Sequence, residues 1–150
     1  MQTARMSHAG ARTERVGALA PEITSPAYQA YLALRTGFVV LPILMGADKF
    51  LNALTNWEQY LAPVLPRAIG VTPELFMRGV GAIEIVAGLL VAVIPRYAGY
   101  VVMAWLWLII VNLVLRGEYW DVALRDFGLS VGAFALARLA TSVHRFSASR

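Results

Sequence analysis

Four long apolar segments constrain this chain of 150 residues more than any other feature of its sequence. They cover residues 27–48, 73–94, 97–115 and 120–141. A helix of ~20 residues crosses the ~30 Å hydrocarbon core of a bilayer, so each segment is long enough to span it. Only 15% of the residues are charged, whereas about 25% is usual in soluble domains. The sequence therefore predicts an all-α protein, an integral membrane four-helix bundle.

The distribution of arginine predicts the orientation and the domain boundaries. Residues 1–26 contain three arginines and lack the apolar core of a signal peptide. We expect a mobile cytoplasmic N-terminal tail (1–26), a transmembrane domain (27–141) and a cytoplasmic C-terminal tail (142–150). Arginines outnumber other charges on the side where this arrangement places both ends, as the positive-inside rule requires. The predicted location is the bacterial cytoplasmic (inner) membrane.

The connection between the first two spans, residues 49–72, is the longest in the chain. Phe50, Leu54, Trp57 and Leu61 recur there at near-helical spacing beside polar residues. This pattern predicts an amphipathic helix lying in the membrane interface, although a soluble loop is an alternative. Tyr60 and Trp57 are interpreted as ordinary interface anchors.

Glu84 is a carboxylate in the middle of the second apolar segment. It lies roughly 16 Å along a helix that starts at Pro73, because the rise is 1.5 Å per residue. Gly81 and Gly88 share its face, where small side chains allow a neighbouring helix to approach. Charge at membrane depth is costly and faces the bundle interior, so Glu84 is predicted to lie in a helix interface.

Arg35 is the partner expected for Glu84. Arg35, Gly46 and Lys49 fall on one stripe of the first segment. If Lys49 and Pro73 lie at the same depth, Arg35 and Glu84 differ by only about 5 Å. The predicted buried pair Arg35–Glu84 has two open interpretations, namely helix packing, or ligand binding and proton handling.

A second group of polar residues gathers toward the outer face in this topology. Its members come from all four segments: Asp48, Lys49, Arg78, Asn112, Arg125 and Asp126. Asp126 is expected to accept from Lys49, Arg78 or Asn112. Gly128 and Gly132 form a G-x-x-x-G surface that usually serves helix packing.

Composition excludes several function classes. The chain has no cysteine, which excludes disulfides, thiolate metal sites and cysteine nucleophiles. No basic patch is interleaved with aromatic residues, so no nucleic-acid partner is expected. Neither paired haem histidines nor a dinucleotide motif is present, so no metal or cofactor site of the chain's own is predicted and its status as an enzyme is open.

Two stretches resemble the DoxX-like family of small four-helix membrane proteins, "LRTGFVVLPILMGADKF" and "GVGAIEIVAGLLVAVI". The resemblance covers about residues 30–140, includes the later "RDFGL" with Asp126, and rests on six motif positions: Arg35, Gly46, Lys49, Gly81, Glu84 and Gly88. It implies similarity to the membrane subunits of thiosulfate:quinone oxidoreductase and to proteins of membrane redox complexes.

The sequence supports two functional hypotheses. The first is a small membrane subunit of a quinone-linked redox complex, with membrane lipid and other membrane subunits as partners and a quinone near the buried charges. The second is a non-catalytic structural or assembly subunit of a larger energy-converting membrane complex. A transporter is a distant third, because the sequence has no obvious inverted repeat or pair of broken helices.

Overall fold

The computed structural model describes residues 25–148, and every regular element in that range is a helix. In chain order these are α2 (Pro26–Leu51), the 3₁₀ helix η1 (Trp57–Tyr60), α3 (Val64–Ile69), α4 (Pro73–Val93), α5 (Pro95–Arg116) and α6 (Trp120–Ala148). The all-α prediction is confirmed. Most of the predicted N-terminal tail (1–26) and the last residues of the C-terminal tail (142–150) lie outside the described residues. Helix α6 continues to Ala148, past its predicted end at residue 141.

Three helices are long and apolar enough to cross a membrane: α2, α4 and α5. Their mean hydropathies are 1.6, 1.9 and 2.2. Helix α6 has 29 residues but does not reach the same apolarity, because charged residues such as Asp121, Arg125 and Asp126 interrupt its first turns. The membrane character is therefore supported, and a fourth span through α6 remains a prediction.

Local capping explains where the apolar helices begin. The Ser25 hydroxyl accepts from Tyr28 N at the start of α2, and the Thr72 hydroxyl accepts from Leu75 N at the start of α4. Each cap precedes a proline, whose missing N–H costs nothing at the first helical position. Only one residue lies between the end of α4 and Pro95, the first residue of α5. This short connection makes the two helices a tight hairpin.

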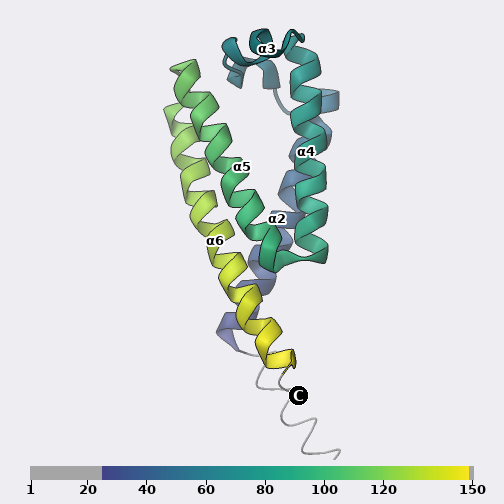
Figure 1. Ribbon diagram of the computed structural model, residues 1–150, viewed down its shortest axis with the longest axis vertical. Helices are drawn as coiled ribbons and strands as arrows, with labels where there is room; N and C mark the ends of the chain where they lie inside the picture. Colours follow the sequence, from purple (N-terminus) through teal and green to yellow (C-terminus); the bar gives the residue numbers. More distant parts are fainter. Residues whose placement is uncertain (1–24, 149–150) are drawn as a thin grey trace, which may run out of the picture.

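The helices pack as two close pairs, α2 with α4 and α5 with α6, and the two pairs contact each other less extensively. Figure 1 shows α2 and α4 on one side and α5 and α6 on the other, with α3 across the upper end. The α4–α5 turn and the described end of α6 lie toward the opposite end (Figure 1). The apolar core where the pairs meet includes Phe38, Val91, Val102 and Leu136.

Glycines set the register between α2 and α4. A Cβ on Gly81 would lie 2.6 Å from the Gly46 carbonyl oxygen, and one on Gly88 would lie 2.9 Å from that of Val39. Backbone packed this closely leaves no room for a larger side chain. The packing roles predicted for Gly46, Gly81 and Gly88 therefore match the geometry.

The α5–α6 contact uses a different glycine from those predicted. A Cβ on Gly99 would lie 2.8 Å from the Ala133 carbonyl oxygen, whereas one on Gly128 would meet nothing within 4 Å. At Gly132 the nearest atoms belong to the Phe38 ring, 3.4 Å away, which is ordinary contact. Of the predicted Gly128–Gly132 packing surface, only Gly132 packs against a helix, and that helix is α2 rather than α5.

The predicted interfacial helix over residues 49–72 is also wrong. Helix α2 continues to Leu51 and ends at Asn52, whose φ of 49° is left-handed. The chain then forms a connecting segment (residues 52–72) that contains only η1 and the six-residue α3. Pro63 and Pro66 prevent a continuous helix there, since proline donates no hydrogen bond and clashes with the preceding turn. The segment instead folds across the end of the bundle.

Candidate functional site

A buried ion pair joins α2 to α4. Lys49 Nζ lies 2.6 Å from Glu84 Oε2, and the two side chains are only 4% and 10% exposed. The close approach of the helices at Gly81 brings the pair together, since a Cβ there would lie 3.0 Å from Lys49 Cβ. Two charges removed from water stay ionised only when they compensate each other, so the contact between Lys49 and Glu84 is a strongly coupled one.

The predicted pair Arg35–Glu84 is wrong. Arg35 instead donates to the carbonyl oxygen of Ala92 near the end of α4, and to the Tyr31 hydroxyl at 3.3 Å. Lys49 lies beside Gly81 rather than level with Pro73. Pro73 is about eight residues further back along α4, roughly 12 Å by the helical rise. The assumed register between α2 and α4 was therefore wrong by about two turns. In the actual register Arg35 lies beyond Glu84, near the end of α4.

Asp126 of α6 adds a second carboxylate near this pair. It is buried, with a side chain 6% exposed, and its closest cation is the outward-facing Arg125, at 3.4 Å from Nε to Oδ1. Asp126 interacts electrostatically with Lys49 and with Glu84, although neither lies within ion-pair distance of it. We call Lys49, Glu84 and Asp126 the buried charge centre. The Lys49 ammonium pairs directly with Glu84 of α4, and Asp126 of α6 adds a second, more distant carboxylate.

Trp57 covers the buried charge centre from the connecting segment. Lys49 Nζ lies 3.7 Å from the centre of the Trp57 ring, a close cation–π contact. The indole Nε1 donates to Asp48 Oδ2 at 2.7 Å. Asp48 also accepts from the backbone N–H groups of Ala53 and Leu54, so it fixes the turn that places Trp57 over the lysine. Trp57 is therefore not an ordinary interface anchor.

Trp105 of α5 lies close to Glu84. Its indole Nε1 is buried and has no hydrogen-bond partner of normal geometry, yet it is close enough to interact with the Glu84 carboxylate. Sequence reasoning missed both Trp57 and Trp105. Trp57 lies in a connection between spans, where a tryptophan is usually an interface anchor, and Trp105 lies in the middle of the apolar α5. Only the tertiary fold shows that both lie near charged side chains.

The remaining members of the predicted outer cluster lie apart from the buried charge centre. Arg78 is exposed and pairs with Glu74 one turn earlier, at 2.7 Å. Asn112 accepts from Ala62 N at 2.9 Å and donates to the Tyr60 carbonyl oxygen at 2.8 Å. The expected contacts of Asp126 with Arg78 or Asn112 do not form, because these two side chains are engaged elsewhere. Asn112 instead anchors the connecting segment to α5.

Comparisons with protein-family models, with curated proteins and with solved structures find no match to this chain. The DoxX-like resemblance therefore stays an expectation that rests on the motif positions.

Proposed function

We propose that this chain is a four-span protein of the bacterial inner membrane that acts as a small subunit of a quinone-linked redox complex. One observation supports it most, the Lys49–Glu84 ion pair with Asp126 nearby, enclosed among apolar helices. Ionisable groups in such surroundings are costly and commonly mark ligand or proton pathways. In this proposal the buried charge centre binds the quinone headgroup and handles its protons.

The chemistry of the three side chains suits that role. A quinone carbonyl oxygen accepts hydrogen bonds, and the Lys49 ammonium has three protons to donate. Reduction of a quinone to a quinol takes up two electrons and two protons. The electrons come from a redox partner subunit, while Glu84 and Asp126 pass protons as general acids and bases. Two carboxylates around one ammonium leave one of them free to exchange a proton while the other stays paired.

The headgroup must displace something to reach Lys49, whose side chain is 4% exposed. Trp57 is the group to move, because it belongs to the connecting segment rather than to a spanning helix. Its ring can stack on a quinone after leaving Lys49. The α2–α4 pair contacts the α5–α6 pair less extensively than the two helices of each pair contact each other. This supports an approach of the quinone from the lipid along the boundary between the two pairs.

The surface of α6 supports its assignment as the fourth span. Large apolar side chains point outward along it, with Leu124 72% exposed and Val131 54% exposed. In the same helix Asp126 and Ser130 are buried. Apolar groups outside and polar groups inside are the reverse of a soluble helix and match a helix in lipid. The low hydropathy of α6 then arises partly from the buried Asp126 and Ser130 and partly from charges near its first turns, such as the exposed Arg125.

A structural subunit without catalysis is the second candidate. The observation that favours it is the tightness of the α2–α4 interface, where Gly46 and Gly81 leave no space beside Lys49. A charge pair enclosed in this way can simply fix helix register and partner choice. The chain would then stabilise an energy-converting complex by packing alone.

The two candidates separate in one experiment. The tagged chain is extracted from native membranes with mild detergent, and the eluate is analysed for proteins, quinones and visible absorption. Asp126→Asn serves as the test variant, because it removes a carboxylate while leaving the Lys49–Glu84 pair intact. A complex that assembles normally but loses quinone reduction supports the working site. Normal quinone reduction by the assembled variant supports the structural role, and a colourless, partner-free wild type contradicts both.

A further inference from the structure

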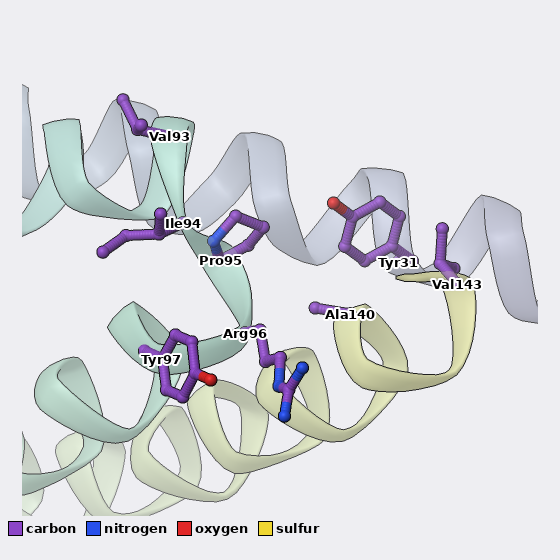
Figure 2. A pocket seen from close by; sticks show the side chains of 8 residues that line it. All are labelled: Tyr31, Val93, Ile94, Pro95, Arg96, Tyr97, Ala140 and Val143. Carbon is purple, nitrogen blue, oxygen red and sulfur yellow. The ribbon is translucent and has the colours of Figure 1, made fainter. Parts of the chain in front are cut away.

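A pocket of about 290 Å³ lies at the end of the molecule opposite to the buried charge centre. Tyr31 and Ala140 line one part of it, and Arg96 and Tyr97 at the start of α5 line another. Figure 2 shows the Arg96 guanidinium and the Tyr97 hydroxyl on the same side, with Tyr31 contributed from a separate helix. The pocket is therefore a junction of α2, α5 and α6 beside the α4–α5 turn.

Charge at this end is entirely positive among the described residues. The stretches 25–40, 88–104 and 134–143 contain Arg35, Arg96 and Arg138 and no aspartate or glutamate. We call this the arginine end. All the described carboxylates lie toward the other end, where ion pairs such as Arg78–Glu74 form. Within the described residues, no carboxylate therefore lies beside the arginines of the arginine end.

Tyr31 and Arg96 both line the pocket, but the Tyr31 hydroxyl and the Arg96 guanidinium point in different directions (Figure 2). The Tyr31 side chain is 6% exposed, and its hydroxyl oxygen accepts from Arg35, which leaves its own proton to donate. Arg96 forms no ion pair within residues 25–148, and its guanidinium carbon lies 5.0 Å from the centre of the Tyr97 ring. The exposed Arg96 guanidinium suits an oxyanion with several acceptor oxygens.

The other walls of the pocket are apolar. Val93, Pro95 and Ala140 line it beside the Arg96 donor. Val93 is 76% exposed and Tyr97 60% exposed, so the pocket opens onto surface that apolar groups dominate. A ligand that fits has an anionic head and an apolar body, which is the chemistry of a phospholipid and not of a small soluble anion.

We propose that this pocket binds the phosphate headgroup of an anionic phospholipid, with Arg96 as the donor and Tyr31 in the pocket wall. Basic pockets between spanning helices recognise such headgroups, and anionic lipid gathers on the cytoplasmic side. The site rests on the membrane assignment but not on quinone chemistry. It places the arginine end at the cytoplasmic leaflet, in agreement with the positive-inside rule.

The test measures lipid binding by the full chain in detergent. Phosphatidylglycerol or phosphatidylcholine is added in steps, and the bound lipid is counted by native mass spectrometry. Arg96→Gln removes the donor, and Arg78→Gln, which replaces an exposed arginine at the other end, is the matched control. We expect saturable binding of phosphatidylglycerol that Arg96→Gln weakens roughly fivefold, the effect of one cation near a lipid surface. Arg78→Gln leaves binding unchanged.

Three results would overturn the site. Equal binding of the two lipids would show that the headgroup charge is not recognised. Equal effects of Arg96→Gln and Arg78→Gln would show general electrostatic attraction instead of a pocket. Displacement of the lipid by inorganic phosphate at equal concentration would show a free-anion site. Thermal unfolding of each variant verifies that binding is measured on folded protein, and failure of quinone binding alone leaves this lipid site unaffected.

Discussion

Lys49 Nζ lies 2.6 Å from Glu84 Oε2, although the two residues are 35 positions apart in the chain. The contact forms where Gly46 and Gly81 bring α2 and α4 together. Each charge is tolerated at this depth only because the other is present. Removing one partner should therefore cost more stability than removing both.

Glu84→Gln should destabilise the protein by about 3–5 kcal/mol, because it removes the only described carboxylate within ion-pair distance of the buried Lys49 ammonium. Reversible unfolding in mixed detergent measures the free energy. The exposed Arg78–Glu74 pair supplies the control, and Arg78→Gln should change stability by at most about 1 kcal/mol. Equal effects of the two substitutions would contradict a tightly coupled buried pair.

The double variant Lys49→Met with Glu84→Met should recover most of the stability that Glu84→Gln loses. Apolar side chains of similar length fill the same space, and replacing a buried ion pair in this way is often neutral or stabilising. The same unfolding measurement applies. A double variant less stable than Glu84→Gln would show that the charges do more than compensate each other.

Gly81→Ala should destabilise the α2–α4 interface by at least about 1–3 kcal/mol, the usual cost of overpacking. Its Cβ would lie 2.6 Å from the Gly46 carbonyl oxygen, and backbone cannot easily move away. Gly79→Ala is the matched control on the same helix, because nothing lies within 4 Å of its Cβ. It should be neutral or stabilising, by up to about 1 kcal/mol from helix propensity. The reverse order of stabilities would disprove the register.

Asn112→Leu should loosen the connecting segment. It removes the acceptor for Ala62 N and the donor to the Tyr60 carbonyl oxygen. Leaving a buried N–H unpaired costs about 1–3 kcal/mol. Hydrogen exchange should become faster at residues 57–62, while the centre of α5 keeps its protection. Unchanged exchange across residues 57–62 would argue against Asn112 as the anchor.

Trp57→Ala should expose Lys49, the only lysine in the chain. The ring covers the ammonium at 3.7 Å, so its removal should raise labelling of Lys49 by a water-soluble amine reagent several-fold. Peptide mass spectrometry measures the labelling, with the N-terminal amine as the internal reference. Trp120→Ala, which removes a tryptophan that is 60% exposed, should have no effect. Full protection of Lys49 without Trp57 would place its cover elsewhere.

The helices could be predicted from sequence because their signals are local. The apolar segments predicted from residues 27 and 73 give the starts of α2 and α4 to within one residue. The same local evidence identified Glu84 as a residue inside a helix interface. Depth along a single helix, however, does not determine the register between two helices.

The charge partners could not be predicted, since they depend on that register. Glycine contacts between α2 and α4 set a register that differs by about two turns from the assumed one. Glu84 therefore pairs with Lys49, and Arg35 donates to a backbone carbonyl oxygen. The folded connecting segment was missed although its signals were present. Pro63 and Pro66 argue against a continuous helix in this segment. Without a continuous helix, the near-helical spacing of its apolar residues does not indicate an interfacial helix. Trp57 then reaches Lys49 only through the tertiary fold.

Quinone binding to the purified chain in lipid nanodiscs tests the central claim most directly. Trp57 and Trp105 lie beside the buried charge centre, so a short-chain quinone bound there should quench tryptophan fluorescence. The account predicts saturable quenching for the wild type and for Arg78→Gln, and only weak, linear quenching for the Lys49→Met, Glu84→Met double variant. Identical quenching curves for the wild type and a folded double variant would contradict a quinone site at Lys49 and Glu84.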